Sequence, residues 1–494
     1  MNKEIRKAIS DEIHRRHGYR FMEAKIKPVH IANALMRTEH QCVGRMSVLK
    51  QLFQATLNQN TIDHRLEAAR SLVENYRERW GRLGEADDLR SSALMTKVLP
   101  LIRTLMGADG AVFGASPEWS SFSSPTALTV TSDVSDDGAG PFIHRLWSGH
   151  GESERLEILD LLNSLTAPGK NASELDDLSA LLAPLVEGIK KKPTSSITAE
   201  DLAISHSPIE TALRDAARSL AAYETKLKPN PIATLQRIVL LAALSVFMHA
   251  ATRPREWSGM PERILLLDAS GDAYSNIADA STRSVAQLIA DAREYMAHVL
   301  RDLLRAEISN WHEKPIEAIN CLMEKLGHAP IDNSNPVIKR LSDIQSESEP
   351  AEVESESAEE IIRAIEGNSG RGLDGYLRLL GIRCGFLYPQ QKNPKKRLVP
   401  TDRTLEVIVA SVIDVSAQPI EYRDFLDLLR QRWGIIVGGR VNDSELLSEI
   451  GALVRARELT ENSERFLSRL ESIGLARRLA DSVAVVGLLE DSYE

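Results

Sequence analysis

Apolar residues recur at helical spacing through the first 106 residues of the chain. Amphipathic segments follow one another with short connections at 3–17, 29–36, 43–57, 62–83 and 91–106. Apolar positions at intervals of three and four residues form one face of a helix, and that face must pack against another element. The pattern therefore predicts an N-terminal helical domain, 1–106, built as a bundle.

Residues 107–150 interrupt this helical pattern. The segment is rich in Gly, Ser, Pro and Asp, with β-type runs at 111–113 and 127–131. Turn-forming residues at this density favour loops and short strands over helix. We therefore expect a small β or irregular insertion between two helical regions.

Residues 151–340 return to helical spacing and predict a second helical bundle. Its expected helices are 153–165, 172–185, 208–227, 231–252, 282–311 and 315–326. We expect Pro254 to end the fourth of these. The most apolar stretch, 238–251, is about fourteen residues long, whereas a bilayer span needs roughly twenty. It is typical of a buried core helix, and because the N-terminus lacks a signal-peptide pattern we expect a cytoplasmic protein.

The segment 341–360 is acidic and of low complexity. Between Gln345 and Glu360 it contains mainly Glu, Ser and Ala, with no aromatic residue. Such a composition buries too little apolar surface to offset the entropy of ordering the chain. We therefore predict a flexible linker, which leaves 361–494 as a tethered C-terminal part.

The stretch 400–488 carries a more distinctive order of elements. The pattern predicts helices at 403–415, 420–433, 444–457 and 463–473, a short strand at 435–437, and a hairpin of 475–479 with 483–486. Thr401 or Asp402 can cap the first helix, and Gly434 and Gly474 can end two others. The sequence thus predicts helices followed by a terminal β-hairpin.

This order resembles that of winged-helix domains. The residues from Phe466 to Val486 look like the third helix and the wing of such domains. The resemblance implies an α+β module that binds DNA or protein and carries no catalytic motif. In its general look, the chain is also similar to helical proteins of bacterial DNA-defence islands. The predicted fold class is mainly α, with helical bundles, a small insertion, an acidic linker and a C-terminal winged helix.

Charge and composition narrow the possible partners. Aromatic residues make up 5% of the chain, and its formal net charge of −10 does not favour general binding to polyanions. Positive charge nevertheless gathers in 371–403, where eight basic residues stand against two acidic ones, a local excess of +6. A basic segment beside a winged helix is suited to phosphate contacts.

Two sets of basic residues are candidates for contact with double-stranded DNA. The first would hold phosphates, and the second would face the major groove or begin the wing. The predicted DNA-contacting residues are Lys392, Lys395, Lys396, Arg397, Arg465, Arg469, Arg477 and Arg478. The alternative is a protein-binding winged helix whose arginines pair with Glu464 and Glu471 in solvent.

The turn that follows the apolar run 264–267 is the strongest candidate for metal chemistry. Asp268, Ser270 and Asp272 supply oxygen atoms that could hold a divalent cation. The turn resembles the metal-coordinating turn of von Willebrand A domains, Asp-x-Ser-x-Ser, with Asp272 in place of the second Ser. The alternative is an ordinary turn stabilised by Asp and Gly. A zinc site at His144 and His150 is a weaker candidate, because their spacing fits no rigid pair.

Motifs for other chemistry do not occur in the sequence. The three cysteines lie far apart, and there is no phosphate-binding loop, no His-Glu-x-x-His and no Gly-x-Ser-x-Gly. We therefore expect no cofactor and no metal centre beyond the weak candidate above.

Three functions remain in view. The first is a non-catalytic scaffold or DNA-binding subunit of a prokaryotic DNA-processing or antiphage defence assembly, with an ATPase or nuclease as partner. The second is a protein-interaction subunit, similar in layout to kleisin-type partners of chromosome-organising ATPases. The third is a metal-dependent enzyme that uses the turn at 268–272.

Overall fold

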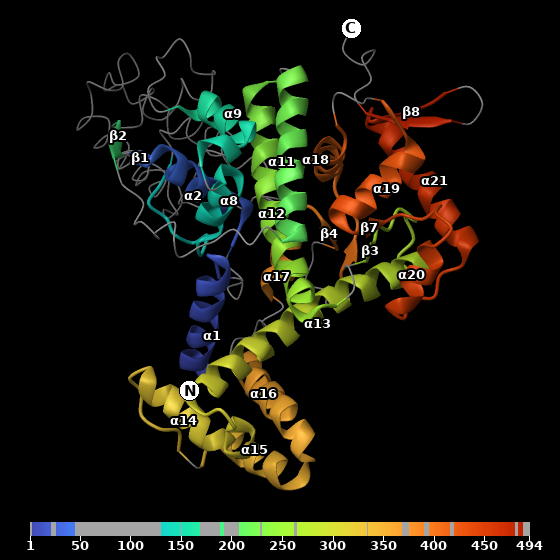
Figure 1. Cartoon of the computed structure of the whole chain (residues 1–494). Coiled ribbons are helices and arrows are strands. Elements are labelled where there is room, and N and C mark those ends of the chain that lie inside the picture. The colour runs from blue at the N-terminus through green and yellow to red at the C-terminus, as the bar shows by residue number, and fades with distance from the viewer. Residues whose placement is uncertain are drawn as a thin grey trace, which may run out of the picture.

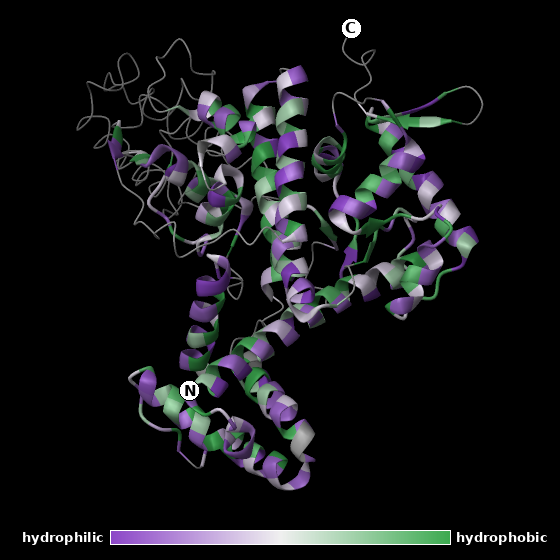
Figure 2. Ribbon diagram, viewed as in Figure 1, coloured by the Kyte–Doolittle hydropathy of each residue, from purple (hydrophilic) through white to green (hydrophobic). Residues whose placement is uncertain are grey.

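The computed structural model describes residues 2–20, 26–44, 130–149, 151–167, 188–191, 207–227, 230–260, 264–332, 334–367, 375–389, 395–414, 419–479 and 483–487. Within these ranges the chain is mainly helical, with small two- and three-stranded sheets (Figure 1). The predicted mainly α class is confirmed. Most helices carry hydrophilic and hydrophobic residues side by side, as amphipathic helices do (Figure 2).

Three long helices form the centre of the fold. They are α11 (Pro208–Leu227), α12 (Pro231–Ser258) and α13 (Asn276–Glu307). The first two run side by side, and α13 crosses below them (Figure 1). Every side chain of α12 from Ile238 to Met248 is buried. Among the described helices, only α12 is long and apolar enough to cross a membrane, and most of that stretch is buried in the fold. The predicted core helix is confirmed.

The end of α12 differs from the prediction. The helix passes through Pro254 and continues to Ser258, where Gly259 in the left-handed region (φ 66°) ends it. A proline removes one backbone donor and disturbs the preceding turn. Here it lies only four residues before the end, so one weakened turn suffices to accommodate it.

Of the four described helices that precede α11, the first packs on α13 and the other three pack on α12. They are α1 (Asn2–His17), α2 (Pro28–His40), α8 (Ala139–Ser148) and α9 (Glu157–Thr166), with the short 3-10 turn η4 (Glu152–Glu154) before α9. After α2, β1 (Cys42–Gly44) pairs antiparallel with β2 (Ile189–Lys191). The helices predicted at 62–83, 91–106 and 172–185 lie outside the described residues, as does nearly all of 43–57.

Helix α8 contradicts the irregular insertion predicted at 107–150 over residues 139–148, whereas residues 130–138 are irregular as predicted. Phe142, Ile143, Leu146 and Trp147 form its buried apolar stripe. Gly140 lets α8 approach α2 closely, since a Cβ atom there would lie 2.4 Å from the Cβ atom of Ala34. Glycine in this segment therefore serves helix packing, whereas the composition alone indicated a loop.

A lower lobe follows α13. It consists of the 3-10 turn η8 (Trp311–Glu313), α14 (Pro315–Lys325), α15 (Pro336–Glu347) and α16 (Pro350–Gly367) (Figure 1). The predicted flexible linker at 341–360 is wrong, because this segment lies in α15 and α16. Val353, Ile361, Ile362 and Ile365 are buried against neighbouring helices. Their spacing supplies an apolar face that the count of glutamates concealed.

The C-terminal region contains several helices with small antiparallel sheets. Its helices are α17 (Gly375–Arg383), α18 (Asp402–Val412), α19 (Tyr422–Trp433), α20 (Asp443–Glu449) and α21 (Ala456–Ser472). Its strands are β4 (Leu387–Tyr388), β5 (Arg397–Leu398), β6 (Ile420–Glu421), β7 (Ile435–Ile436), β8 (Ala476–Arg478) and β9 (Ala484–Val486). Strands β6, β9 and β8 form an antiparallel sheet in that order.

The boundary between α20 and α21 differs from the prediction. The helix predicted at 444–457 ends at Glu449, and α21 begins seven residues earlier than predicted, at Ala456. Gly451, with φ 70° in the left-handed region, interrupts the helical conformation between them. The Glu458 carboxylate then accepts a hydrogen bond from the Arg455 N–H, which starts α21.

The C-terminal region is joined to the body, contrary to the expected tether. Strand β3 (Leu265–Leu266) pairs in parallel with β7, and Leu267 forms a bridge with Leu398. One hydrophobic cluster runs from Ile5 to Val486. The described residues before and after the predicted linker therefore share a core.

Candidate functional site

The turn at 268–272 is held by hydrogen bonds within the chain. The Asp268 carboxylate accepts from the Ser270 amide at 2.9 Å and from its hydroxyl at 2.6 Å. Its other oxygen lies 2.5 Å from the Arg397 guanidinium, and Asp268 is only 2% exposed. The Asp272 carboxylate accepts from the Tyr274 amide. The arrangement has the hydrogen bonds expected of an Asp-stabilised turn with its charge paired.

The carboxylate groups of the predicted metal ligands, Asp268 and Asp272, are therefore already engaged in hydrogen bonds or an ion pair. Among the described residues, no group of three or more His, Cys, Asp and Glu side chains could hold a metal ion. Of the two histidines considered for zinc, His144 is hydrogen-bonded through Nε2 to the Glu39 carboxylate at 2.9 Å, and His150 is outside the described residues. Within the described part of the chain, the side chains at 268–272 are therefore engaged with one another and with Arg397 rather than arranged around a cation site.

Asn462 of α21 fastens this helix to the strand end. Its Nδ2 donates to the carbonyl oxygens of Leu267 and Val437, both at 2.8 Å, and its Oδ1 accepts from the Ala269 amide at 2.8 Å. Asn462 is 1% exposed. Sequence reasoning missed this residue. The available signal was an asparagine on the apolar face of a helix, since a buried amide needs partners.

The basic segment before α18 is not uniformly accessible. Lys392 lies outside the described residues, and Lys395 is exposed. Lys396 is 2% exposed, and its ammonium donates to the Pro389 carbonyl. Arg397 forms the ion pair with Asp268. The expectation that Lys396 and Arg397 lie ready for phosphates is therefore corrected, since a phosphate contact would require these internal bonds to break.

Arg465 and Arg469 lie on the side of α21 that contacts the body. Arg465 donates to the Ser270 carbonyl. Arg469 donates to the Pro400 carbonyl and to the Asp402 carboxylate, both at 2.7 Å. Arg469 is thus paired with a carboxylate, whereas Arg465 stays exposed to solvent, and DNA contact by this pair stays a prediction. Partners distant in sequence, which periodicity cannot reveal, decide the role of both arginines.

The solvent face of α21 carries paired charges of both signs. Arg478 of β8 lies 3.1 Å from Glu464 and 3.3 Å from Glu471. Arg457 lies 2.8 Å from Glu461, one turn along the helix. This is the pairing proposed as the alternative to DNA contact. Arg477 is exposed on the same strand as Arg478.

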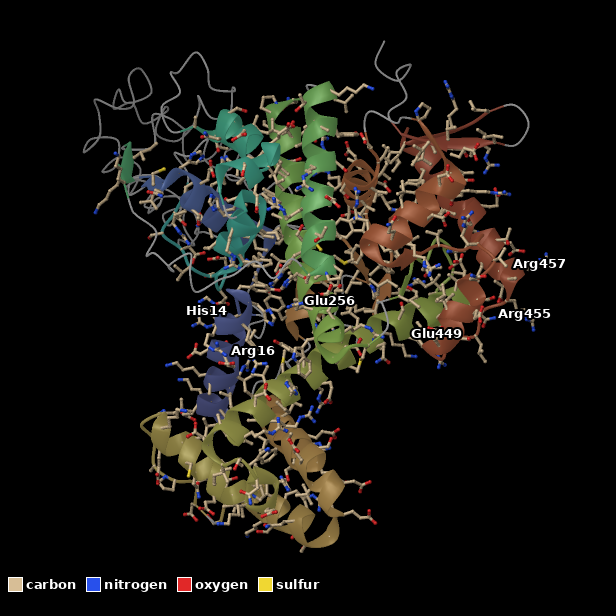
Figure 3. All side chains as sticks on the ribbon, in the orientation of Figure 1. His14, Arg16, Glu256, Glu449, Arg455 and Arg457 are labelled. Atoms are coloured by element: carbon tan, nitrogen blue, oxygen red, sulfur yellow. The ribbon has the colours of Figure 1, made fainter. Side chains whose placement is uncertain are left out.

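The amino end of α21 forms an exposed surface, here called the α21 tip, made of Tyr274, Leu453, Arg455 and Arg457. Tyr274 is 98% and Leu453 is 84% exposed. The Glu458 carboxylate links the segment of Tyr274 to that of Leu453, because it accepts hydrogen bonds from the Asn276 side-chain amide and from the Arg455 main-chain N–H. Figure 3 shows Arg455 and Arg457 at the outer edge of the molecule. Sequence reasoning missed this surface because it placed the helix start too late.

A buried polar cluster joins α1, α11, α12 and α13. The His17 ring lies 2.5 Å from the Tyr295 hydroxyl, and the Tyr19 hydroxyl lies 2.8 Å from His249. Glu210 lies 3.5 Å from the other ring nitrogen of His249. Burial lowers the pKa of His17 well below its usual value, and it also lowers the pKa of His249, against the opposing effect of Glu210. The cluster stabilises the fold when both imidazoles are neutral.

No protein-family model matches this chain, and a comparison with curated proteins finds no significant match.

Proposed function

We propose that residues 402–487 form a winged-helix module. The order helix, strand, helix, helix, strand, strand is present from α18 to β9, with β7 and α20 inserted before α21. The first strand pairs with the last, and the last two form the hairpin, as in the three-stranded sheet of such domains. Helix α21 then takes the place of the third helix, and the β8–β9 hairpin that of the wing.

We further propose that the chain is a non-catalytic interaction subunit that binds a partner protein through the α21 tip. The observation that carries this is the exposure of Tyr274 and Leu453, which belong to two segments that Glu458 joins by hydrogen bonds. Large apolar side chains beside arginines are typical of the centre of protein interfaces. The rest of this surface is poorly suited to a phosphate backbone, because Arg457, Arg469 and Arg478 are each paired with a carboxylate and Arg465 donates to a main-chain carbonyl.

The kind of assembly follows from the module. A winged helix in a subunit without catalytic motifs is consistent with a DNA-processing or antiphage defence complex whose ATPase or nuclease is a separate chain. The continuous core argues against a kleisin-like layout with a flexible linker, since α15 and α16 are packed on the body. The partner would therefore meet a rigid surface.

Site-specific photo-crosslinking in the native host tests the proposal. A photoreactive amino acid replaces Tyr274 or Leu453 in the full chain. The same replacement at Val134, which is 70% exposed and distant in sequence from both tip residues, is the matched control. We expect one protein species to be trapped from both tip positions and not from position 134. Trapping of DNA, equal trapping from all three positions, or no trapping contradicts the proposal.

Direct DNA contact is a second candidate, supported by one observation. Arg455 and Arg457 lie at the amino end of α21, where the helix dipole also attracts anions. In a duplex titration across a salt series, DNA contact there would give steep salt dependence, which Arg455→Glu with Arg457→Glu would reduce. If this double variant leaves duplex affinity unchanged, the second candidate is excluded. A chain truncated at Glu360, which lacks the C-terminal region, is not a suitable control for this titration, because the truncation would remove part of the hydrophobic core that this region shares with the body.

A further inference from the structure

A cavity lies between α11 and the connection from α8 to α9. Its volume is about 340 Å³, which falls in the range of small-molecule sites. The lining residues are Ser153, Glu154, Arg155, Leu156, Thr211, Arg214 and Arg218. The lining contains three arginines and one glutamate, and carboxylates outside the lining pair with two of the arginines.

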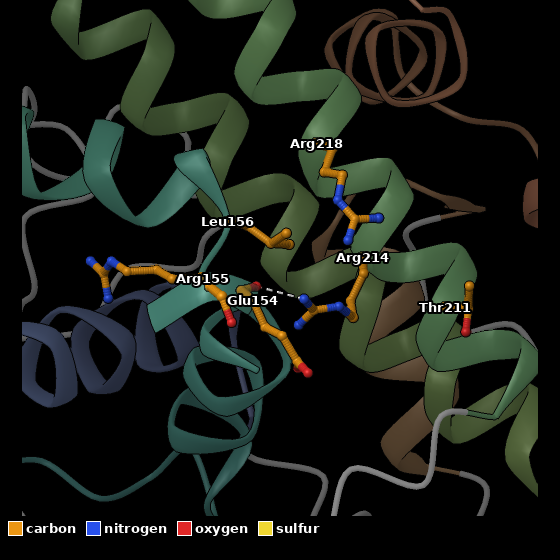
Figure 4. A pocket seen from close by; sticks show the side chains of 7 residues that line it. Glu154, Arg155, Leu156, Thr211, Arg214 and Arg218 are labelled. Atoms are coloured by element: carbon orange, nitrogen blue, oxygen red, sulfur yellow. Dashed lines mark hydrogen bonds between the residues drawn. The ribbon is translucent and has the colours of Figure 1, made fainter. Parts of the chain in front are cut away.

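The α11 side of the cavity is arranged along one helix face. Thr211, Arg214 and Arg218 lie at intervals of three and four residues, so their side chains follow one stripe. In Figure 4, Arg214 extends from α11 toward Glu154, whereas Arg155 points away from both arginines of α11. The charge available to a ligand therefore comes from Arg214 and Arg218.

Arg214 is buried at the back of the cavity with a charge that no carboxylate neutralises directly. It is 7% exposed, and it donates to the main-chain carbonyls of Leu146 and Glu154, the latter at 2.6 Å. Burial lowers the pKa of Arg214, and the positive charge of Arg218 lowers it further. A buried cation held in place by two carbonyls favours an incoming anion.

The other two arginines are more engaged. Arg155 lies 2.7 Å from Glu39 and 2.9 Å from Asp160. Arg218 lies 2.5 Å from Asp215 in an exposed ion pair. Such a pair contributes little to the free energy of folding, so a ligand that binds Arg218 more strongly can replace Asp215. Arg218 can therefore turn to a ligand, while Arg155 remains part of the wall.

We propose that this cavity binds the phosphate group of a phosphorylated small molecule that also carries hydroxyl groups, such as a nucleotide or a sugar phosphate. The guanidinium groups of Arg214 and Arg218 and the Thr211 hydroxyl hold the phosphate oxygens. The Glu154 carboxylate accepts a hydrogen bond from a ligand hydroxyl. The site is independent of the module proposed above, because none of its residues contributes to the α21 tip.

Calorimetric titration of the full chain tests the site with four probes: inorganic phosphate, adenosine monophosphate, ribose 5-phosphate and adenosine. We expect the phosphorylated compounds to bind, adenosine not to bind, and inorganic phosphate to compete. Binding of adenosine as tight as that of its monophosphate overturns the proposal. Absence of binding by every phosphorylated probe at millimolar concentration does so as well.

Variants then locate the site. Arg218→Ala should weaken phosphate binding about tenfold or more, because one charge-assisted bond is lost. Arg340→Ala is the matched control, since Arg340 forms a similarly exposed pair with an aspartate three residues away, Asp343. Equal effects of both variants contradict the site. Arg214 is left intact because it also caps the end of α8 through the Leu146 carbonyl.

Glu154→Gln separates the two parts of the proposal. Loss of the negative charge should tighten binding of inorganic phosphate, while the preference for ribose 5-phosphate over inorganic phosphate should shrink. The main-chain carbonyl that accepts from Arg214 is unaffected by this change. If neither quantity changes, Glu154 does not contact the ligand and a hydroxyl-bearing ligand is not selected.

Discussion

The replacement Asn462→Ala should destabilise the junction between α21 and the strand end more than any surface change. The side chain makes three hydrogen bonds, to the carbonyls of Leu267 and Val437 and from the amide of Ala269. Alanine leaves these main-chain groups without their partner, at about 1–3 kcal/mol for each buried group. Because the three losses share one site and water can enter it, we expect a total of about 3–5 kcal/mol.

Hydrogen exchange is the appropriate assay, since a chain of this length need not unfold in one step. Asn462 bridges the ends of β3 and β7, and the amides of Leu265 and Leu267 donate to the carbonyls of Gly434 and Ile436 between these two strands. The exchange of these two amides therefore reports the opening of the strand pair that Asn462 holds. Thr460→Ala, on the exposed side of the same helix, should change the opening free energy by less than about 0.5 kcal/mol. If Asn462→Ala lowers it by less than about 1 kcal/mol, Asn462 does not fasten α21 as argued.

Three further predictions follow from other contacts. Asp268→Ala or Arg397→Ala alone should cost about 3 kcal/mol in chemical denaturation, and the double variant should cost clearly less than the sum, because it leaves no buried charge unpaired. Since the pKa of His17 is lowered in the fold, the unfolded chain binds a proton that the native chain excludes, so stability should fall as pH drops through 6.5. Melting curves from pH 8 to pH 5 should show this fall, and His17→Phe should flatten it. Gly140→Ala should lower the melting temperature by forcing α8 away from α2, because its Cβ atom would overlap the neighbouring backbone; an unchanged melting temperature contradicts that close packing.

The strongly periodic helices could be predicted because their signal is local. The spans of α11, α18 and α19 agree with the apolar spacing to within three residues, and β8 and β9 form the hairpin predicted from 475–479 and 483–486. The segment 341–360 could not be predicted from composition. Glutamate is a good helix former, so an acidic run is compatible with a helix. The isoleucines that pack α16 against its neighbours lie after the acidic run, and the composition of the run alone therefore did not indicate an amphipathic helix.

The candidate surface was harder to predict, because the role of a charged side chain depends on which oppositely charged groups the fold places beside it. From sequence, Arg465 and Arg469 are four residues apart on one helical face, which is also the pattern of groove-facing residues. In the fold that face meets the 268–272 turn and the start of α18, nearly 200 and 70 residues away in the chain. A helix with acidic and basic residues around its polar side therefore presents different charges to solvent depending on which side the body covers. Here Arg465 and Arg469 are hydrogen-bonded to the body, although Arg465 remains exposed, and Glu461 and Glu464 pair with Arg457 and Arg478. We therefore propose that a partner recognises the exposed apolar tip rather than the row of arginines.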